Sequence, residues 1–473
     1  MNRFCHHCLA LLGIVTAAGC AELPTDNRRT VDLIVEAEYL LTMTSEAVAY
    51  DQAVAIDAGM IVAVDDAETI ARQFRAAEII SGESRVLMPG LVNGHTHAAM
   101  ALMRGIADDL ELMTWLTQYI FPAELELVDE DFIATGTTLA CYEMIRGGIT
   151  SFVDMYFFPD TVAQAVVDCG LRAIVVPSVI EQASPDARDF TQSLAQAIDF
   201  AERWRDKHPR IVPALGAHSV YTIGREALET LVAAANDHGL AISIHVAESP
   251  FEMQITADNY GKSPVALLEE LGYLDVPLIA AHVVHGDADD WQRMARNNVG
   301  AIHNPTSNLK LSSGVSPVVD MRRAGVTVGL GTDGAASNND LDLWEEIRLA
   351  SLLAKGIGMV PTHLPAYEAL KMATSDGAAA IGLADRVGSI EVGKRADLIQ
   401  VATDDLTFAP MYEPISHLVY VADEHDVVTT IVEGVVLMRD REILTIDAAR
   451  LRDNVARHRE RIRALVGPKT ATD

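Results

Sequence analysis

The sequence predicts an α/β protein that consists of a (β/α)8 TIM barrel and a small β-sandwich domain built from both chain ends. Eight apolar, strand-like runs alternate with longer amphipathic segments through the middle of the 473-residue chain, and β-rich segments flank this middle part. Repeated strand–helix units favour a parallel sheet, and eight of them favour a closed barrel over an open, doubly wound sheet. No glycine-rich dinucleotide-binding motif follows the first strand, which also disfavours the open sheet.

Residues 1–20 have the pattern of a signal peptide. Arg3 gives a cationic start, and the apolar run at 9–18 is too short to cross a bilayer as a stable helix. Ala17-Ala18-Gly19-Cys20 resembles the processing site of a bacterial lipoprotein, in which Cys20 would be lipidated and become the new N-terminus. We therefore expect export to the periplasm or the envelope, with membrane attachment only through Cys20; a cytoplasmic location is the alternative.

The segments 30–85 and 388–445 are expected to form one composite β domain. Their β-rich runs, separated by turn residues, predict strands at 31–35, 52–56, 60–64, 388–401 and 427–436. The barrel is expected over 86–387, and a C-terminal helix and tail over 446–473.

The middle of the chain contains the predicted barrel strands and the helices between them. The strands are expected at 86–93, 150–155, 172–179, 211–217, 241–246, 278–284, 299–302 and 326–331. Apolar residues with helical spacing predict helices at 130–146, 189–205, 226–238 and 264–271.

Composition and charge exclude several classes of protein. Hydrophobic residues make up 49% of the chain and charged residues 22%, which is typical of a globular protein and not of a disordered chain or a coiled coil. The formal net charge is -31, so the surface repels phosphate groups. We therefore expect neither nucleic acid nor an anionic membrane face as a partner.

Histidines are concentrated at the carboxyl ends of the predicted barrel strands, the face at which barrel enzymes carry their active sites. Seven of the 15 histidines lie there: His95, His97, His218, His245, His282, His285 and His303. In a strand, residues i and i+2 point to the same side, so the imidazoles of His95 and His97 can converge on one point. Neutral imidazole is a good ligand for Zn²⁺ and similar ions, which predicts a metal site.

Two further strand ends supply the rest of this site. His245 ends the fifth strand and offers a third nitrogen donor, while Glu248 lies just beyond it. Asp333 ends the eighth strand, where a buried carboxylate is costly unless a cation is near, so it is the expected fourth ligand. Three histidines and one aspartate leave room for a water, as in catalytic sites, and His282 at the end of the sixth strand could accept its proton. We expect the second carboxylate oxygen of Asp333 to be free to hold that water.

These motifs together resemble the amidohydrolase superfamily, in its single-metal deaminase branch. The chain is similar to the 5-methylthioadenosine/S-adenosylhomocysteine deaminases and the related chlorohydrolases from about residue 31 to 436. The segments that carry the resemblance are Pro89-Gly-Leu-Val-Asn-Gly-His-Thr-His97, His245-Val-Ala-Glu248, Ala281-His-Val-Val-His285, Asn304-Pro-Thr-Ser-Asn-Leu-Lys-Leu311 and Gly331-Thr-Asp-Gly-Ala-Ala-Ser-Asn338.

The resemblance implies a role for each site residue. It implies that His95, His97, His245 and Asp333 hold the metal. It implies that Glu248 passes a proton to the heterocycle and that His282, alongside Asp333, activates water. The residues implied to contact the substrate are Trp115, Glu124, Arg172, His218, Glu248 and Ser337, with Glu124 placed on the ribose hydroxyls and Trp115 packed on the substrate.

The implied reaction is the deamination of an adenine nucleoside: 5′-methylthioadenosine, S-adenosylhomocysteine or adenosine. Hydroxide generated at the metal would attack C6 and release ammonia with the inosine analogue. The implied cofactor is one divalent ion, Zn²⁺ first and Fe²⁺ second, and the partner is a small heterocycle, with a homo-oligomer left open.

Two kinds of alternative stay open. The first is another hydrolase: a chlorohydrolase, a guanine deaminase or a different aminohydrolase. The second is a non-catalytic binding relative, which would be expected to have lost metal ligands that this sequence keeps.

Overall fold

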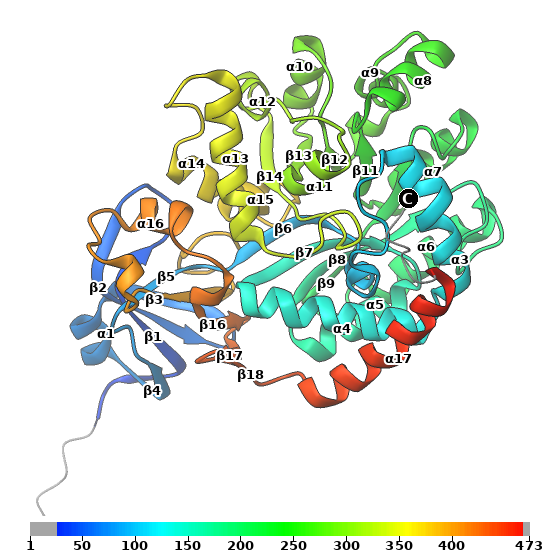
Figure 1. Cartoon of the computed structure of the whole chain (residues 1–473). Helices are drawn as coiled ribbons and strands as arrows, with labels where there is room; N and C mark the ends of the chain where they lie inside the picture. The colour runs from blue at the N-terminus through cyan, green and yellow to red at the C-terminus, as the bar shows by residue number, and fades with distance from the viewer. Residues whose placement is uncertain (1–25, 467–473) are drawn as a thin grey trace, which may run out of the picture.

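The structure is a computed structural model that describes residues 26–466 of the chain. Figure 1 shows a barrel surrounded by helices, with a β domain attached at one side. The β domain combines the first strands of the chain with strands from its C-terminal part, as expected from the sequence. The predicted signal peptide and the lipidation site at Cys20 lie outside the described residues.

Eight parallel strands form the barrel, in sequence order around it. They are β6 (Leu91–Thr96), β7 (Ile149–Tyr156), β8 (Arg172–Val179), β10 (Leu215–Ser219), β11 (Ile242–Val246), β12 (Leu278–His282), β13 (Gly300–His303) and β14 (Thr327–Leu330); the short β9 (Ile211–Pro213) pairs with β8. Nearly all their residues are buried, because helices cover the outside and side chains fill the inside.

Helices connect the strands and form the outer layer of the barrel (Figure 1). In chain order these helices are α4 (Glu130–Gly147), α5 (Pro159–Cys169), α6 (Phe190–Trp204), α7 (Arg225–His238), α8 (Pro250–Tyr260), α9 (Pro264–Glu270), α10 (Ala288–Arg296), α11 (Pro305–Lys310), α12 (Val318–Ala324), α13 (Leu343–Gly358), α14 (Ala366–Met372) and α15 (Ser375–Ala380). Between β6 and α4, the chain adds a segment of short helical turns: η1 (Ala98–Met103), α2 (Leu112–Thr114), η2 (Trp115–Ile120) and α3 (Phe121–Leu127).

The seam between the first and last barrel strands is closed by side chains as well as backbone. The Asn93 side chain accepts a hydrogen bond from the Thr332 N–H (3.1 Å) and donates one to Thr332 Oγ1 (2.7 Å). The Asp333 N–H donates to the His95 carbonyl at 3.0 Å. Gly331 permits this close approach, because a Cβ there would lie 2.9 Å from the His95 nitrogen. Two predicted metal-binding residues are therefore tied together at the seam.

The strands of the β domain form one continuous hydrogen-bonded sheet, in the order β18-β17-β16-β15-β5-β1-β2-β3, with β4 paired to β1. They are β1 (Arg29–Leu41), β2 (Val48–Asp57), β3 (Met60–Asp66), β4 (Phe74–Ile80), β5 (Arg85–Pro89), β15 (Leu398–Ala402), β16 (Val427–Val432), β17 (Val435–Arg439) and β18 (Glu442–Ile443). The helices α1 (Ala67–Gln73) and α16 (Pro414–Tyr420) belong to the same end segments.

The expected domain boundary at residue 86 is corrected by this sheet. The run expected as one strand, 86–93, is two strands: β5 pairs with β1 and β15 in the β domain, and β6 begins the barrel after Gly90. Both strands are almost wholly buried, so the sequence shows one apolar run and no polar signal at the change of direction. Similarly, the run expected at 388–401 is a strand only from Leu398.

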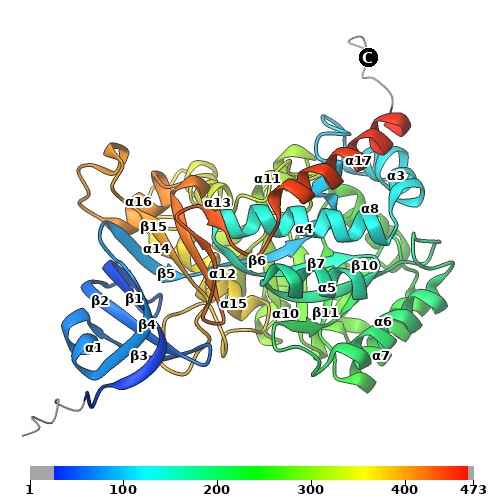
Figure 2. The same ribbon diagram turned by 90° about the horizontal axis from the view of Figure 1, so that it is seen from below.

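The chain closes with α17 (Ala448–Val466), which is the predicted C-terminal helix. Figure 2 shows it lying along α4 and reaching the end of α3. Within residues 26–466, no helix has both the length and the apolar character needed to cross a membrane.

Candidate active site

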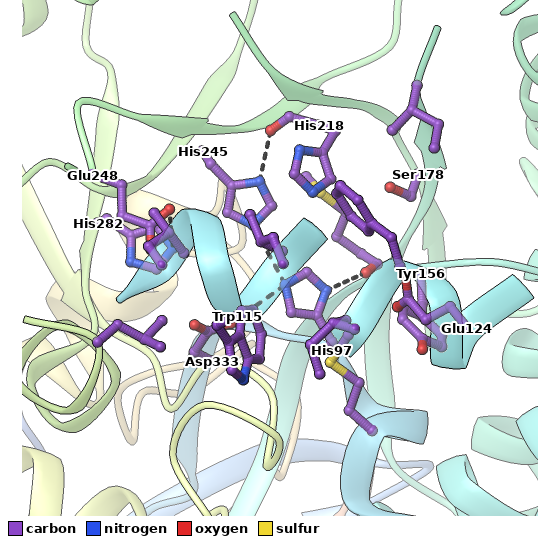
Figure 3. A pocket seen from close by; sticks show the side chains of 18 of the residues that line it. His97, Trp115, Glu124, Tyr156, Ser178, His218, His245, Glu248, His282 and Asp333 are labelled. Carbon is purple, nitrogen blue, oxygen red and sulfur yellow. Dashed lines mark hydrogen bonds and ion pairs between the residues drawn. The ribbon is translucent and has the colours of Figure 1, made fainter. Parts of the chain in front are cut away.

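The four predicted metal ligands meet at the carboxyl-terminal mouth of the barrel. The Nε2 atoms of His95 and His97 lie 3.4 Å and 3.3 Å from Oδ1 of Asp333. The Nε2 atom of His245 lies 3.4 Å from Nε2 of His97 (Figure 3). Residues from β6, β11 and the end of β14 therefore direct one donor atom each toward a common point.

The hydrogen bonds around these imidazoles suit a metal ion. Both ring nitrogens of His95 are buried without a hydrogen-bond partner, and burial lowers the pKa of this imidazole to about 4, so it is neutral. Nδ1 of His97 lies 2.5 Å from the Met155 carbonyl, and Nδ1 of His245 lies 2.6 Å from the His218 carbonyl. Each carbonyl requires an Nδ1–H donor, which leaves the Nε2 lone pair for a metal. The donor set of three neutral imidazoles and a carboxylate fits a divalent ion such as Zn²⁺.

Asp333 is held by hydroxyl groups on the side away from the histidines. Its Oδ2 accepts hydrogen bonds from Ser307 (2.7 Å) and Ser337 (2.9 Å), and its Oδ1 accepts one from the Gly334 N–H at 2.8 Å. Burial opposes ionisation of Asp333, but the adjacent imidazoles of His95 and His97 hold its pKa well below the usual range.

Two expectations are corrected here. Ser337 was expected to contact the substrate, but its buried hydroxyl is used to orient Asp333. The second oxygen of Asp333 was expected to be free for a water, but it already accepts two hydroxyl hydrogen bonds.

Glu248 and His282 face each other across the mouth of the site. Oε2 of Glu248 lies 4.0 Å from Nε2 of His282, and both side chains are buried (Figure 3). Burial, with the negative charge of Asp333 nearby, raises the pKa of Glu248 well above its usual value, which favours the protonated form. Oδ1 of Asn308 lies 2.8 Å from Nδ1 of His282. Nδ2 of Asn304 lies 3.2 Å from the same ring nitrogen, and Nε2 of His282 is directed toward Glu248.

The backbone is strained at these positions. Ala247, His282 and Asp333 have φ values of 52°, 72° and 62°, in the left-handed region that side chains other than glycine rarely adopt. Such strain is stored at functional sites when the surrounding structure enforces it. The three residues lie at or just after the carboxyl ends of β11, β12 and β14, beside the metal-ligand cluster.

Glu252 is a site residue that the sequence reasoning missed. It lies in the first turn of α8, fully buried, and its two oxygens accept the N–H groups of Ala247 (2.9 Å) and Glu248 (2.8 Å). A signal was available, because Ser249-Pro-Phe-Glu252 has the spacing of a helix capping box. In the structure, Ser249 caps the helix while the glutamate holds the preceding strand end.

A pocket opens from the metal-ligand cluster. Its empty space, counted out to the open mouth and including solvent there, is about 590 Å³. Its wall is mainly apolar and includes Trp115, and the lining also contains His218, Tyr156 and Glu124. Of these, Trp115, Glu124 and His218 were predicted to contact the substrate, and Tyr156 was not identified from the sequence.

Glu124 and His218 both lie in this pocket as uncharged groups. Burial raises the pKa of Glu124 to about 8, so the carboxyl group is neutral at pH 7 in the absence of a ligand. Burial lowers the pKa of His218 to about 3, and its Nδ1 lies 3.1 Å from the Thr222 hydroxyl.

Arg172 was expected to bind the substrate, and the structure places it elsewhere. It begins β8, at the amino-terminal end of the barrel, and its guanidinium is fully buried. Nε and Nη2 donate to the two carboxylate oxygens of Asp397 at 2.9 Å and 3.2 Å. Arg172 therefore joins the barrel to the β domain. The sequence gave no signal that separates this structural role from substrate binding, because a cation at a helix–strand junction can serve either.

Comparison with known proteins agrees with this geometry. The model of the amidohydrolase family matches residues 86–437. The chain is 45% identical to a protein of Desulforudis audaxviator named 5-methylthioadenosine/S-adenosylhomocysteine deaminase, over 83% of this chain and 91% of that protein. A protein of the same name from Syntrophobacter fumaroxidans is 42% identical, over 90% of this chain and 97% of the relative.

Solved structures show the same relationship. An adenosine deaminase from Xanthomonas campestris with bound zinc has a TM-score of 0.90 and 39% identity, over 92% of this chain and all of that one. An atrazine chlorohydrolase from Arthrobacter aurescens, with zinc, has a TM-score of 0.83 over 90% of this chain and all of that one; at 24% identity it shows the shared fold alone. From its matched family model, its relatives and its metal-ligand cluster, the chain is a member of the amidohydrolase family.

Proposed function

We propose that the protein is a metal-dependent deaminase that converts an adenine nucleoside and water into the inosine analogue and ammonia. The observation that carries this proposal is the arrangement of the pocket. A protonated Glu248 and the metal-ligand cluster form one end, and a buried Glu124, suited to a sugar diol, forms the other (Figure 3).

One divalent ion is proposed, Zn²⁺ first and Fe²⁺ second, held by His95, His97, His245 and Asp333. Two groups of three donors lie close enough to hold an ion: His95 with His97 and Asp333, and His95 with His245 and His282. Both include His95, which favours a single ion. When bound, such an ion supplies a Lewis acid that lowers the pKa of a water to near neutrality.

The side chains of Glu248 and His282 would move the protons. The Glu248 carboxyl donates its proton to the ring nitrogen beside C6, which makes that carbon more electrophilic. Nε2 of His282 accepts a proton from the attacking water, whose oxygen forms the new bond to C6. The C6–N bond of the amino group then breaks, and the leaving nitrogen takes the proton from His282 and departs as ammonia. As the C6–O bond becomes a double bond, the new hydroxyl group returns its proton to Glu248, and the ring nitrogen keeps the proton that it received.

Glu124 would orient the sugar. Two adjacent hydroxyl groups can both donate to one carboxylate, and this gain offsets the cost of ionising a buried group whose pKa is about 8. Trp115 is buried in the same wall and offers a flat surface for the substrate.

A panel of substrates with zinc-loaded protein tests the proposal by ammonia release. The panel contains adenosine, 5′-methylthioadenosine, S-adenosylhomocysteine, adenine, guanine and a chlorotriazine. We expect turnover of at least one nucleoside, with adenine much slower because it lacks the sugar that Glu124 holds. Turnover of only guanine or only the triazine would overturn the proposal in favour of the corresponding alternative.

We further propose that the chain is exported and anchored through Cys20. The support is the sequence of residues 1–20 alone. Expression of the full chain in a Gram-negative host, followed by fractionation and labelling with a fatty-acid analogue, tests it. We expect labelled protein in the membrane fraction and none with Cys20→Ser; equal, unlabelled cytoplasmic protein from both would contradict it.

A further inference from the structure

We propose that Cys141 and Cys169 form an intramolecular disulfide bond when the protein meets a disulfide oxidant. The bond would join α4 to α5 and stabilise the part of the barrel that it encloses. The sequence has five cysteines, and these two are the ones within residues 26–466, where both are free thiols. The proposal is independent of the deaminase activity, since neither cysteine lines the pocket at the metal-ligand cluster.

The two cysteines are neighbours on adjacent helices. Cys141 lies in the second half of α4, Cys169 is the last residue of α5, and the two helices pack against each other (Figure 1). The two thiols are hydrogen-bonding neighbours, and both side chains belong to the same buried apolar cluster. Thiols in contact can be joined with little movement of the helices, whereas a disulfide between distant cysteines would require the backbone to move.

The surroundings of Cys141 make it a poor first nucleophile. The hydrogen bond with Cys169, together with burial, raises the pKa of the Cys141 thiol well above its ordinary value. The thiolate is the form that attacks a disulfide, so a thiol that holds its proton reacts slowly. We therefore assign the first step of the oxidation to Cys169.

Cys169 is the cysteine that a small reagent can reach. It lines a pocket between α4, α5 and the start of α17, and the empty space there, counted out to the open mouth and including solvent, is about 660 Å³. The Thr445 hydroxyl donates to the Cys169 carbonyl at 2.7 Å and so holds the end of α5 beside this pocket. Cys141 is fully buried and does not line the pocket. A small disulfide in the pocket would therefore meet Cys169 first.

The reaction consists of two thiol–disulfide exchanges. The Cys169 sulfur, as a thiolate, bonds to one sulfur of the oxidant, whose S–S bond breaks and releases one thiol. The Cys141 sulfur then bonds to the Cys169 sulfur, and the mixed disulfide breaks to release the second thiol. The protons of the two cysteines end on the released thiols, so the cysteine pair loses two electrons and the oxidant gains them. Disulfide oxidants of this class act in the compartment to which we propose that the chain is exported.

The bond would close a loop that contains one strand of the barrel. The chain from Cys141 to Cys169 comprises the end of α4, all of β7 and all of α5. β7 supplies the Met155 carbonyl that lies 2.5 Å from Nδ1 of His97, so the enclosed segment includes a support of the metal-ligand cluster. Closing a loop restricts the unfolded chain and thereby favours the folded state.

Thiol counting with bis(2-hydroxyethyl) disulfide, a small uncharged oxidant, tests the proposal. The full chain carries Cys5→Ser, Cys8→Ser and Cys20→Ser, so that only the pair remains, and it is purified in the reduced form. After treatment, alkylation in denaturant and mass spectrometry should find no free thiol and no attached reagent. A proteolytic digest should contain one pair of peptides joined through Cys141 and Cys169. Two free thiols, reagent attached to both cysteines, or disulfides between molecules would overturn the proposal.

Two single variants in the same background test the order of the steps. Cys141→Ser lacks the second nucleophile, so half of the reagent should stay attached to Cys169. Cys169→Ser should keep Cys141 as a free thiol. Attachment at Cys141 in the second variant, with none at Cys169 in the first, would show that the assigned order is wrong.

Thermal unfolding tests the stabilising role. We expect Tm of the oxidised protein to be about 2–5 °C higher than that of the reduced protein. The double variant Cys141→Ser/Cys169→Ser is the control, and its Tm should not change on treatment with the reagent. A Tm of the oxidised protein equal to or below that of the reduced protein would refute the stabilisation.

Discussion

The side chain of Glu252 accepts the backbone N–H of Glu248 at 2.8 Å and so fixes the residue that we propose as the proton donor. Burial raises the pKa of Glu252 to about 8, although the N–H groups of Ala247 and Glu248 favour its ionised form. The contact joins the first turn of α8 to the end of β11.

Replacement of Glu252 should impair catalysis while the metal stays bound. In Glu252→Gln, an amide N–H₂ would face a backbone N–H, so one buried donor is left unpaired and Glu248 shifts. We expect kcat to fall about 10- to 100-fold, since small misplacements of a reacting group have effects of this size. Metal content should equal that of wild type. Glu226→Gln, at an exposed position in α7, is the control and should keep full activity.

Loss of a single imidazole should remove the ion. His95 is fully buried, and its Nε2 lies 3.4 Å from Oδ1 of Asp333, so His95→Ala removes a donor atom from the centre of the cluster. We expect purified His95→Ala to contain less than about a tenth of the metal of wild type and to show no ammonia release, by elemental analysis and kinetics. Wild type should bind one equivalent; two equivalents, or an active metal-free variant, would contradict the assignment. His425→Ala, exposed on the β domain side, is the control.

Glu124 should make the protein less stable as pH rises. Its folded pKa is about 8 and its ordinary value is 4.5, so between these pH values the unfolded chain has released a proton that the folded protein keeps. The free energy of unfolding therefore decreases with rising pH over this window, and the contribution is constant above it. The difference in unfolding free energy between Glu124→Gln and wild type should increase from about pH 4.5 to 8 and then level off, as measured in urea. A difference independent of pH would mean that Glu124 is ionised throughout. The same variant should raise KM for nucleosides.

The buried pair of Arg172 and Asp397 should matter for stability and not for the reaction. Asp397→Asn leaves the fully buried guanidinium without its charge partner, which typically costs about 3–5 kcal/mol. We expect the urea midpoint to fall clearly, with kcat/KM per folded, metal-loaded molecule unchanged. Arg172→Met combined with Asp397→Leu should recover part of the loss. Arg225→Ala, which breaks exposed ion pairs, should change stability by less than about 1 kcal/mol. A selective rise in KM for Arg172→Met would instead support the expected role of Arg172 in substrate binding.

Arg461 on α17 should act on the substrate site from a distance. Its Nη2 donates to the Leu127 carbonyl at 3.2 Å and pairs with Asp129 at 3.0 Å, directly after the helix that carries Glu124. We expect Arg461→Ala to raise KM several-fold with little change in kcat, because only the sugar-binding segment is loosened. Arg461→Lys should restore part of the effect. A proportional fall in kcat with unchanged KM would indicate damage at the metal end.

The sequence was sufficient for the parts of the site that lie on regular elements. His95, His97, His245 and Asp333 lie in or just after the ends of strands whose apolar runs are plain in the sequence, and the barrel fold brings such ends together. The pairing of Glu252 with two backbone N–H groups, or of Asn308 with His282, depends on how loops fold back over those ends. Periodicity holds no information about such contacts.

The two misassigned residues have a common physical origin. Arg172 and Ser337 are both polar, both buried and both near strand ends, as substrate-binding residues would be. Their actual partners, Asp397 and Asp333, are carboxylates that need compensation in the interior. A buried polar side chain can contact a substrate or a neighbouring charged residue. Which of the two it contacts depends on the end of the barrel at which it lies and on where its atoms point, and this is visible only in the three-dimensional structure.

The seam between β6 and β14 has a consequence for synthesis of the protein. His95 belongs to the first strand of the barrel and Asp333 follows the last strand. The Asp333 N–H donates a hydrogen bond to the His95 carbonyl. A nascent chain on the ribosome therefore contains the three histidine ligands before Asp333, which is added only after the last strand of the barrel has been translated. Ion capture is consequently coupled to completion of the barrel, and a prematurely terminated product would be released without a competent centre.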